Sequence, residues 1–156
     1  MNCHIEQAHI DHIPDITKMV RLADREEIWA SSMQSPERVM QRGLVISDFA
    51  LTGFVDETPV LMWGVVIQSF IGSVGTPWMV GTEHLDKVAI PFLRRCRAPV
   101  MALFENYDKL QNHVDARNVK AIQWLKWLGF KFEAEPRPYG YLSLPFYKFW
   151  MEKDNV

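Results

Sequence analysis

The chain has 156 residues, of which 48% are hydrophobic and 23% charged, and its formal net charge is −2. This length predicts one ordinary domain over residues 1–156, and the slightly acidic balance argues against a broad surface for nucleic acid or anionic membranes. Residues 1–6 lack the pattern of a signal peptide, and the longest apolar run, 60–67, is far shorter than the ~20 residues that span a bilayer. We therefore expect a protein that neither enters a membrane nor binds nucleic acid.

Cysteine and histidine spacing predicts no metal site. Cys3 and Cys96 form no CxxC or Cys/His pattern, so idle thiols in a reducing compartment are favoured over a disulfide. His9 and His12 have no partners at a ligand spacing. We expect them to be solvated residues near a helix start.

The first part of the chain alternates between strand and helix patterns. A strand is expected over residues 4–10 and a helix from about residue 12, with Pro14 in its first turn. Ser35 and Pro36 predict a second helix start. Strands over 49–55 and 60–70 should form a hairpin. The apolar stripe of the first helix is expected to be Ile13, Ile16, Val20 and Ala23.

The middle of the chain reads as a loop over 72–77, a short strand over 78–80 and a helix beginning at Thr82. Pro91 should kink this helix, because proline removes a backbone donor and clashes one turn back. Pro99 should then start a further helical segment.

The stretch 110–130 predicts a strand, a tight loop, an amphipathic helix and a second strand. Asn118 is expected to cap the helix with its side chain, and Gly129 to end it in a left-handed turn. A stiff connector should follow over 136–140. The last strand, 144–151, is apolar on both faces, so it is either central in the sheet or its second face meets another partner.

The positions Val114, Asn118, Ala121, Leu125 and Gly129, with the element order, resemble the second half of a GNAT (Gcn5-related N-acetyltransferase) domain. The resemblance implies an α/β (α+β) fold, with a mixed, mostly antiparallel sheet of about seven strands and about four flanking helices. In many active members a tyrosine protonates the departing thiolate of coenzyme A. The matching residue here is Leu125, which has no proton to give.

The resemblance also implies where acetyl-CoA would bind. Its diphosphate would lie at the start of the helix after the fourth strand. Relatives carry a glycine-rich segment there, whose backbone amides converge on the phosphates. Here that segment, 80–86, has one glycine and two acids, Glu83 and Asp86, which repel a diphosphate. We expect no cofactor; if acetyl-CoA binds, its contacts should be Val80, Gly81, Thr82 and Asn118.

Four segments, 59–64, 78–83, 106–114 and 118–129, resemble the GNAT-like internal virion protein A family of short-tailed phages. This resemblance implies a non-catalytic role in virion assembly or inside the particle, in the cytoplasm of an infected bacterium. The alternative is a divergent acyl-CoA-dependent N-acetyltransferase acting on a host protein or small amine, with Tyr139 or Tyr141 replacing the usual acid. A third hypothesis is an antagonist that binds a host regulatory or defence protein.

Other polar clusters are expected to be structural. His113 and Asp115 share a strand face and suggest a base with its orienting group, but ordinary hydrogen bonding is favoured. The basic cluster Arg94, Arg95 and Arg97 reads as a solvated helix face. Glu105 and Asp108 have no accompanying base.

Trp127 is the sharpest local prediction. It lies across its helix from the apolar stripe, beside Lys120 and Gln123, where a tryptophan is costly to leave in water. Two interpretations remain open. It anchors a protein interface or self-association, or the 136–140 connector or neighbouring lysine stems cover it.

Overall fold

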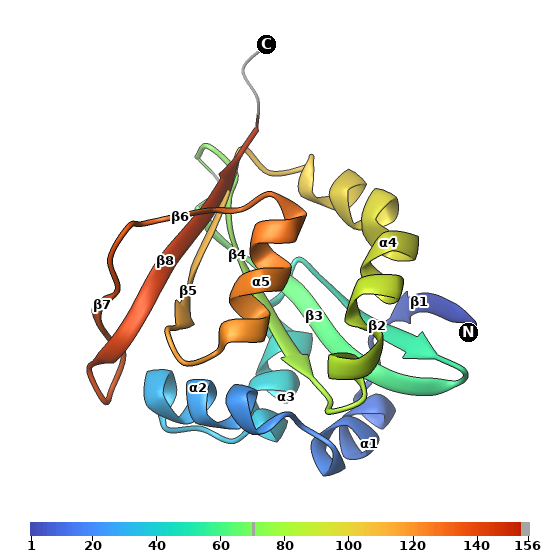
Figure 1. Ribbon diagram of the computed structural model, residues 1–156. Coiled ribbons are helices and arrows are strands. Elements are labelled where there is room, and N and C mark those ends of the chain that lie inside the picture. Colours follow the sequence, from blue (N-terminus) through green and yellow to red (C-terminus); the bar gives the residue numbers. More distant parts are fainter. Residues whose placement is uncertain (70, 154–156) are drawn as a thin grey trace.

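The computed structural model describes residues 1–69 and 71–153 (Figure 1). A mixed sheet with strand order β1-β2-β3-β4-β5-β8-β6 forms its centre, and β7 pairs with β8. Among the described strands, β4 and β5 are parallel and the other neighbours antiparallel. The strands are β1 (Cys3–Gln7), β2 (Phe49–Val55), β3 (Thr58–Ser69), β4 (Val74–Gly81), β5 (Lys109–Asp115), β6 (Lys131–Phe132), β7 (Arg137–Tyr139) and β8 (Leu144–Glu152). The predicted mixed, mostly antiparallel sheet is confirmed, with eight strands instead of about seven.

Helices cover both faces of this sheet (Figure 1). Alternation along β3 divides the core: Met62 packs with α1 and α3, whereas Leu61 and Trp63 point to α4 and α5. None of the helices in the described residues is long and apolar enough to cross a bilayer. The helices are α1 (Ile13–Lys18), α2 (Leu22–Ser32), α3 (Pro36–Ile46), α4 (Leu85–Phe104) and α5 (Val119–Leu128), preceded by a 3-10 turn, η1 (Ile10–His12).

The first predicted helix is two helices, α1 and α2. The break falls at residues 19–21, where the backbone pairs with the end of β4 instead of continuing the helix. Val20 forms a β-bridge with Thr82, and the amide of Arg21 donates to the carbonyl of Gly81 at 2.9 Å. The break therefore joins the start of α2 to the start of α4.

The middle of the chain also differs from the prediction. Strand β4 begins at Val74 and includes Gly75 and Pro77, which were expected in a loop. Gly75 fits because a Cβ there would lie 2.5 Å from a methyl carbon of Val65. Helix α4 continues through both prolines, so the predicted restart at Pro99 is wrong. The predicted strand end Phe70 lies outside the described residues.

The β5–α5–β6 unit is confirmed, and Gly129 ends α5 with φ of 106°. Asn118 precedes α5 as predicted but forms no side-chain cap, because its side chain turns into the protein interior. The connector includes β7, and the amide of Tyr141 then donates to the Ser31 carbonyl at the end of α2. The predicted central position of β8 is confirmed by its pairing with β5, β6 and β7.

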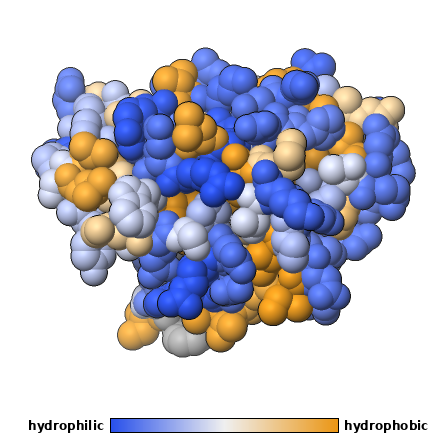
Figure 2. All heavy atoms as spheres, turned by 90° about the horizontal axis from the view of Figure 1, so that it is seen from below, coloured by the Kyte–Doolittle hydropathy of each residue, from blue (hydrophilic) through white to orange (hydrophobic). Residues whose placement is uncertain are grey.

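The surface viewed from the α1–α3 end is mostly hydrophilic, with apolar groups in separate places (Figure 2). Exposed apolar side chains on these helices include Leu22, Trp29 and Val45. Scattered apolar groups are normal for a protein surface and do not by themselves mark a site.

Candidate functional site

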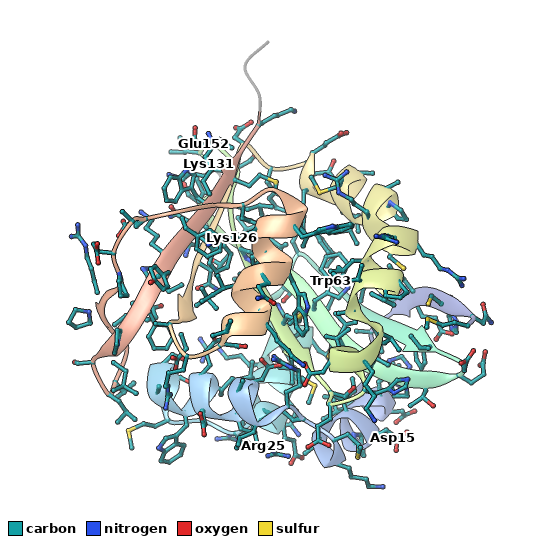
Figure 3. The ribbon with its side chains drawn as sticks, viewed as in Figure 1. Asp15, Arg25, Trp63, Lys126, Lys131 and Glu152 are labelled. Carbon is teal, nitrogen blue, oxygen red and sulfur yellow. The ribbon has the colours of Figure 1, made fainter. Side chains whose placement is uncertain are left out.

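Strands β4 and β5 pair at two positions, Val74 with Lys109 and Gly75 with Leu110, and then diverge (Figure 1). The gap between them opens under α4 and α5 into a cavity of about 160 Å³. Figure 3 shows Trp63 reaching from β3 into the space between the two helices. The cavity is largely apolar, and its polar lining groups include Asp24, Glu27 and Asn118.

Most backbone hydrogen-bonding groups on the edge of β4 that faces this gap already have partners within the chain. In an antiparallel ladder the backbone groups of alternate residues point away from the partner strand, and on β4 these residues are Pro77, Met79 and Gly81. Pro77 has no amide hydrogen, and its carbonyl accepts from Asn112 Nδ2 at 2.7 Å. The amide of Gly81 donates to Asp24 Oδ2 at 2.8 Å, and its carbonyl accepts from Arg21. Of these three residues, Met79 is therefore the one whose backbone amide and carbonyl are left to bond to a ligand in the gap.

The segment between β4 and α4 uses its amides in the same way. The Thr82 amide donates to the Val60 carbonyl at 2.9 Å, and the Glu83 amide to the Met19 carbonyl at 2.8 Å. Thr82 is 2% exposed, and its hydroxyl also donates to the Val60 carbonyl. Val80 is fully buried on the α1 and α3 side of the sheet, away from the gap. These amides hold the segment to β3 and to the α1–α2 break.

A buried arginine occupies the space beside the start of α4. Arg21 is 4% exposed; its Nε donates to Asp86 Oδ1 and its Nη1 to Asp24 Oδ1, both at 2.7 Å. The guanidinium carbon lies 4.7 Å from the ring centroid of Trp124. Burying a charge is unfavourable unless it is paired and hydrogen-bonded, and here both conditions are met. Arg21 thus links α2, α4 and α5.

Asn118 and Glu27 extend this network towards the cavity. Asn118 is 1% exposed; its Oδ1 accepts from Arg21, and its Nδ2 donates to Asp24 Oδ1 at 3.1 Å and Glu27 Oε1 at 3.4 Å. Glu27 Oε1 also accepts the amide of Asp115 at 2.8 Å. Burial, followed by the nearby charge of Asp24, raises the pKa of Glu27 to about 8. Burial also raises the pKa of Asp24, against the opposing effect of Arg21.

Several solved structures that superpose on this chain are named as acetyltransferases. A GNAT-family acetyltransferase from Streptococcus pneumoniae superposes with a TM-score of 0.64 and 13% identity, over 98% of this chain and 100% of that one. A ribosomal-protein-S5-alanine acetyltransferase from Vibrio fischeri gives 0.69 and 14%, over 99% and 95%. The chain has the GNAT fold. A third GNAT-fold match is a spermidine N-acetyltransferase from Vibrio cholerae, solved with CoA and spermine, with a TM-score of 0.68 and 10% identity over 96% and 95% of the chains.

These identities are low, so the likeness establishes the GNAT fold and leaves the activity to be argued from the site. No protein-family model and no curated protein sequence matches the chain.

The residues at the expected cofactor position do not fit a diphosphate. A helix start binds phosphate through free amides that converge on it, but those of Gly81, Thr82 and Glu83 already have acceptors. Asp86 adds a carboxylate beside the same helix start. Four residues were predicted to contact acetyl-CoA if it binds. Gly81 and Asn118 both hydrogen-bond to Asp24, whereas Val80 and Thr82 are buried in the core.

The expected proton donors are also displaced from the gap. Leu125 lines the cavity, as the GNAT resemblance requires of that position. Tyr139 stacks on His113 with ring centroids 3.9 Å apart, and Tyr141 is 75% exposed beside the end of α2. Burial, then the charge of Lys148, lowers the pKa of His113. A neutral His113 is therefore favoured near neutral pH, packed between strand and connector.

The remaining candidates have structural partners. Asp115 accepts from Arg117 Nη2 at 2.7 Å rather than orienting His113. His9 caps η1, and His12 Nδ1 lies 2.9 Å from Thr52 Oγ1, so His12 is more engaged than the predicted solvated residue.

In the part of the chain that the structure describes, neither the cysteines nor the acids assemble a metal site. Cys3 and Cys96 are free thiols. Glu105 and Asp108 are exposed. Residues 1–69 and 71–153 contain no group of three or more His, Cys, Asp or Glu placed to hold a metal ion.

Sequence reasoning missed Arg21, Asp24 and Glu27. The sequence does not mark them as buried, because the pairing of residues 19–21 with β4 leaves no periodic signal. An Arg and an Asp three residues apart at a helix start were a weak local hint of an ion pair.

Proposed function

We propose that the chain is a GNAT-fold protein that acts by binding another protein, without transferring an acetyl group. The observation that carries this proposal is the commitment of the Gly81, Thr82 and Glu83 amides to acceptors within the chain. A diphosphate placed there would have to displace the Asp24 carboxylate and two backbone carbonyls, and it would lie near Asp86. Leu125 in place of a proton donor supports the same proposal.

The sequence resemblance to internal virion protein A-like proteins suggests the setting. On that reading the protein acts in the assembly of a short-tailed phage particle, or within it, in the cytoplasm of an infected bacterium. Its partner is then a virion protein or a second copy of itself, with Trp127 as the anchoring residue. This assignment rests on the four sequence segments that carry the resemblance.

One observation favours the alternative, an acyl-CoA-dependent N-acetyltransferase acting on a host protein or small amine. The gap between β4 and β5 does hold a cavity of about 160 Å³, and Glu27 beside it has a pKa of about 8. A carboxyl group whose pKa lies near the operating pH can exchange a proton with an amine, and it accepts one in its ionised fraction. Acetyl-CoA would be required, and Arg21, Asp24 and Asn118 would have to rearrange to admit it.

Incubation of the purified protein with radiolabelled acetyl-CoA and host lysate separates the two proposals. We expect no label on proteins or small amines, while an active spermidine N-acetyltransferase run in parallel labels spermidine. Label transfer that is lost in Glu27→Gln would overturn the non-catalytic proposal and establish the alternative.

Affinity capture from two lysates tests the setting. A tagged chain should recover a specific protein from phage-infected cells and nothing specific from uninfected cells. Specific recovery from uninfected cells, lost in Trp127→Ala, would instead support an antagonist of a host protein.

A further inference from the structure

The outer sides of α4 and α5 enclose a second hollow, separate from the gap between β4 and β5. This groove has a volume of about 370 Å³ and is open to solvent. Lys87, Ile90 and Pro91 of α4 line one wall, and Lys120, Gln123 and Trp127 of α5 line the other. The predicted face of Trp127, Lys120 and Gln123 is therefore one wall of a groove.

Each wall of the groove carries a partly exposed apolar side chain. Ile90 is 39% exposed, and Trp127 is half-buried with the Arg97 guanidinium carbon 5.6 Å from its ring centroid. The connector over 136–140 does not cover Trp127, because it runs beside α2 and β8. That alternative for Trp127 is wrong. The stem of Lys126 does not cover it either, since Lys126 turns to Phe132 on the β8 side of α5 (Figure 3), whereas Lys120 lines the same groove as Trp127.

Pro91 removes one helical hydrogen-bond donor from the same wall. A proline inside a helix cannot donate to the carbonyl four residues earlier. In α4 that carbonyl belongs to Lys87, which lines the groove. The Lys87 carbonyl therefore lacks the amide donor that residue 91 would supply in an uninterrupted helix.

The rim of the groove is cationic. Lys87, Lys120 and Arg97 are exposed around it. Asp86 is the acid in its lining, and Arg21 Nε already binds it at 2.7 Å, with Lys120 Nζ at 3.8 Å. The chain as a whole has a net charge of −2, so this rim is a local departure from the overall balance. Its charge complements an acidic ligand.

We propose that the α4–α5 groove binds an acidic segment of a partner protein that carries one apolar side chain. The apolar side chain packs between Ile90 and Trp127, and flanking carboxylates pair with Lys87 and Lys120. A backbone amide of the segment donates to the Lys87 carbonyl. This inference rests on the proposed protein-binding function and names the chemistry of the partner.

The test uses synthetic peptides and the amide and indole signals of the full-length ¹⁵N-labelled protein. The test peptide is acetyl-Glu-Asp-Glu-Leu-Asp-Glu-amide, and controls replace its leucine with serine or its acids with glutamine and asparagine. We expect the test peptide to shift the Trp127 indole and the Ile90 and Lys120 amides. The leucine-free and uncharged controls should bind at least about tenfold more weakly, equivalent to about 1.4 kcal/mol.

Matched charge reversals locate the site. The double variant Lys87→Glu, Lys120→Glu should abolish the shifts, whereas Arg38→Glu, an exposed reversal on α3, should retain them. Raising the ionic strength from about 0.05 M to about 0.5 M should weaken binding, because exposed charge pairs are screened. Proton spectra and thermal melts of each variant confirm that it is folded.

The inference is overturned if no peptide shifts the groove signals, if the uncharged peptide binds as well as the acidic one, or if the groove is closed by self-association on a sizing column. Titration with acetyl-CoA keeps this failure distinct from failure of the proposed function. Absence of both peptide and acetyl-CoA binding defeats the inference alone. Saturable shifts with acetyl-CoA at the groove and at Gly81 defeat both.

Discussion

Helix α5 carries two tryptophans, each beneath an arginine, and they face opposite environments. Trp124 lies inside, 9% exposed, with the Arg21 guanidinium carbon 4.7 Å from its ring, and that guanidinium is fully engaged with Asp24, Asp86 and Asn118. Trp127 lies outside on the groove, with an exposed arginine, Arg97, at 5.6 Å. The inner pair lies beside the start of α4, with its charge satisfied within the chain. The outer pair leaves aromatic surface and positive charge available to a partner.

Removing the inner arginine should have the largest effect. Arg21→Met leaves the buried Asp24 without its cation, and breaking a buried pair in this way costs about 3–5 kcal/mol of unfolding free energy. Lys120→Met is the matched control: it also removes a cation from Asp86, but an exposed one, and should cost about 0–1 kcal/mol. Urea denaturation of both variants measures the difference. Equal small losses would mean that Arg21 does not hold the inner network together.

The two tryptophans provide the second test. Trp124→Ala should cost about 3–5 kcal/mol, because it empties a packed aromatic site. Trp127→Ala should cost less than half as much, because one side of its ring already faces the groove, and it should abolish partner or peptide binding. Thermal melts run beside binding assays give both quantities. A larger loss of stability for Trp127 than for Trp124 would contradict the division into inner and outer sides.

Glu27 gives the inner side a pH dependence. Below about pH 4.5 the carboxyl is protonated in both the folded and the unfolded chain, so its full contribution to stability is present. Between about 4.5 and about 8 the unfolded chain ionises while the folded one keeps its proton, so stability falls as pH rises. The fall is at most about 1.4 kcal/mol per pH unit.

Glu27→Gln removes this titration while keeping an acceptor oxygen. We expect its stability relative to the native chain to increase across the same window, as measured by urea denaturation at several pH values. A constant difference between the two proteins would show that Glu27 does not carry the raised pKa.

The sequence predicted the fold better than the site, for physical reasons. Apolar periodicity and the stop at Gly129 located β5, α5 and β6, because local patterns determine such elements. The length of β4 was missed because Gly75 and Pro77 signal a loop locally, whereas close packing on Val65 and the gap beside β5 make both acceptable in a strand.

The buried network was missed for a different reason. Arg21 and Asn118 are far apart in sequence and meet only when the fold brings the start of α2 to the start of α5. Asn118 was expected to cap a helix, a local role, but the tertiary partners Asp24 and Glu27 take its side chain. The poor match of residues 80–86 to a diphosphate-binding motif was nevertheless visible in the sequence, because it depends only on which residues are present there.

Isothermal titration of the native chain with acetyl-CoA tests the central claim most directly. If the amides of Gly81, Thr82 and Glu83 remain committed to Asp24, Val60 and Met19, no saturable heat should appear at ligand concentrations up to about 1 mM, a limit near −4 kcal/mol of binding free energy. One-site binding with a dissociation constant of about 1 μM, near −8 kcal/mol, would contradict the claim and show that the inner network opens to admit the cofactor.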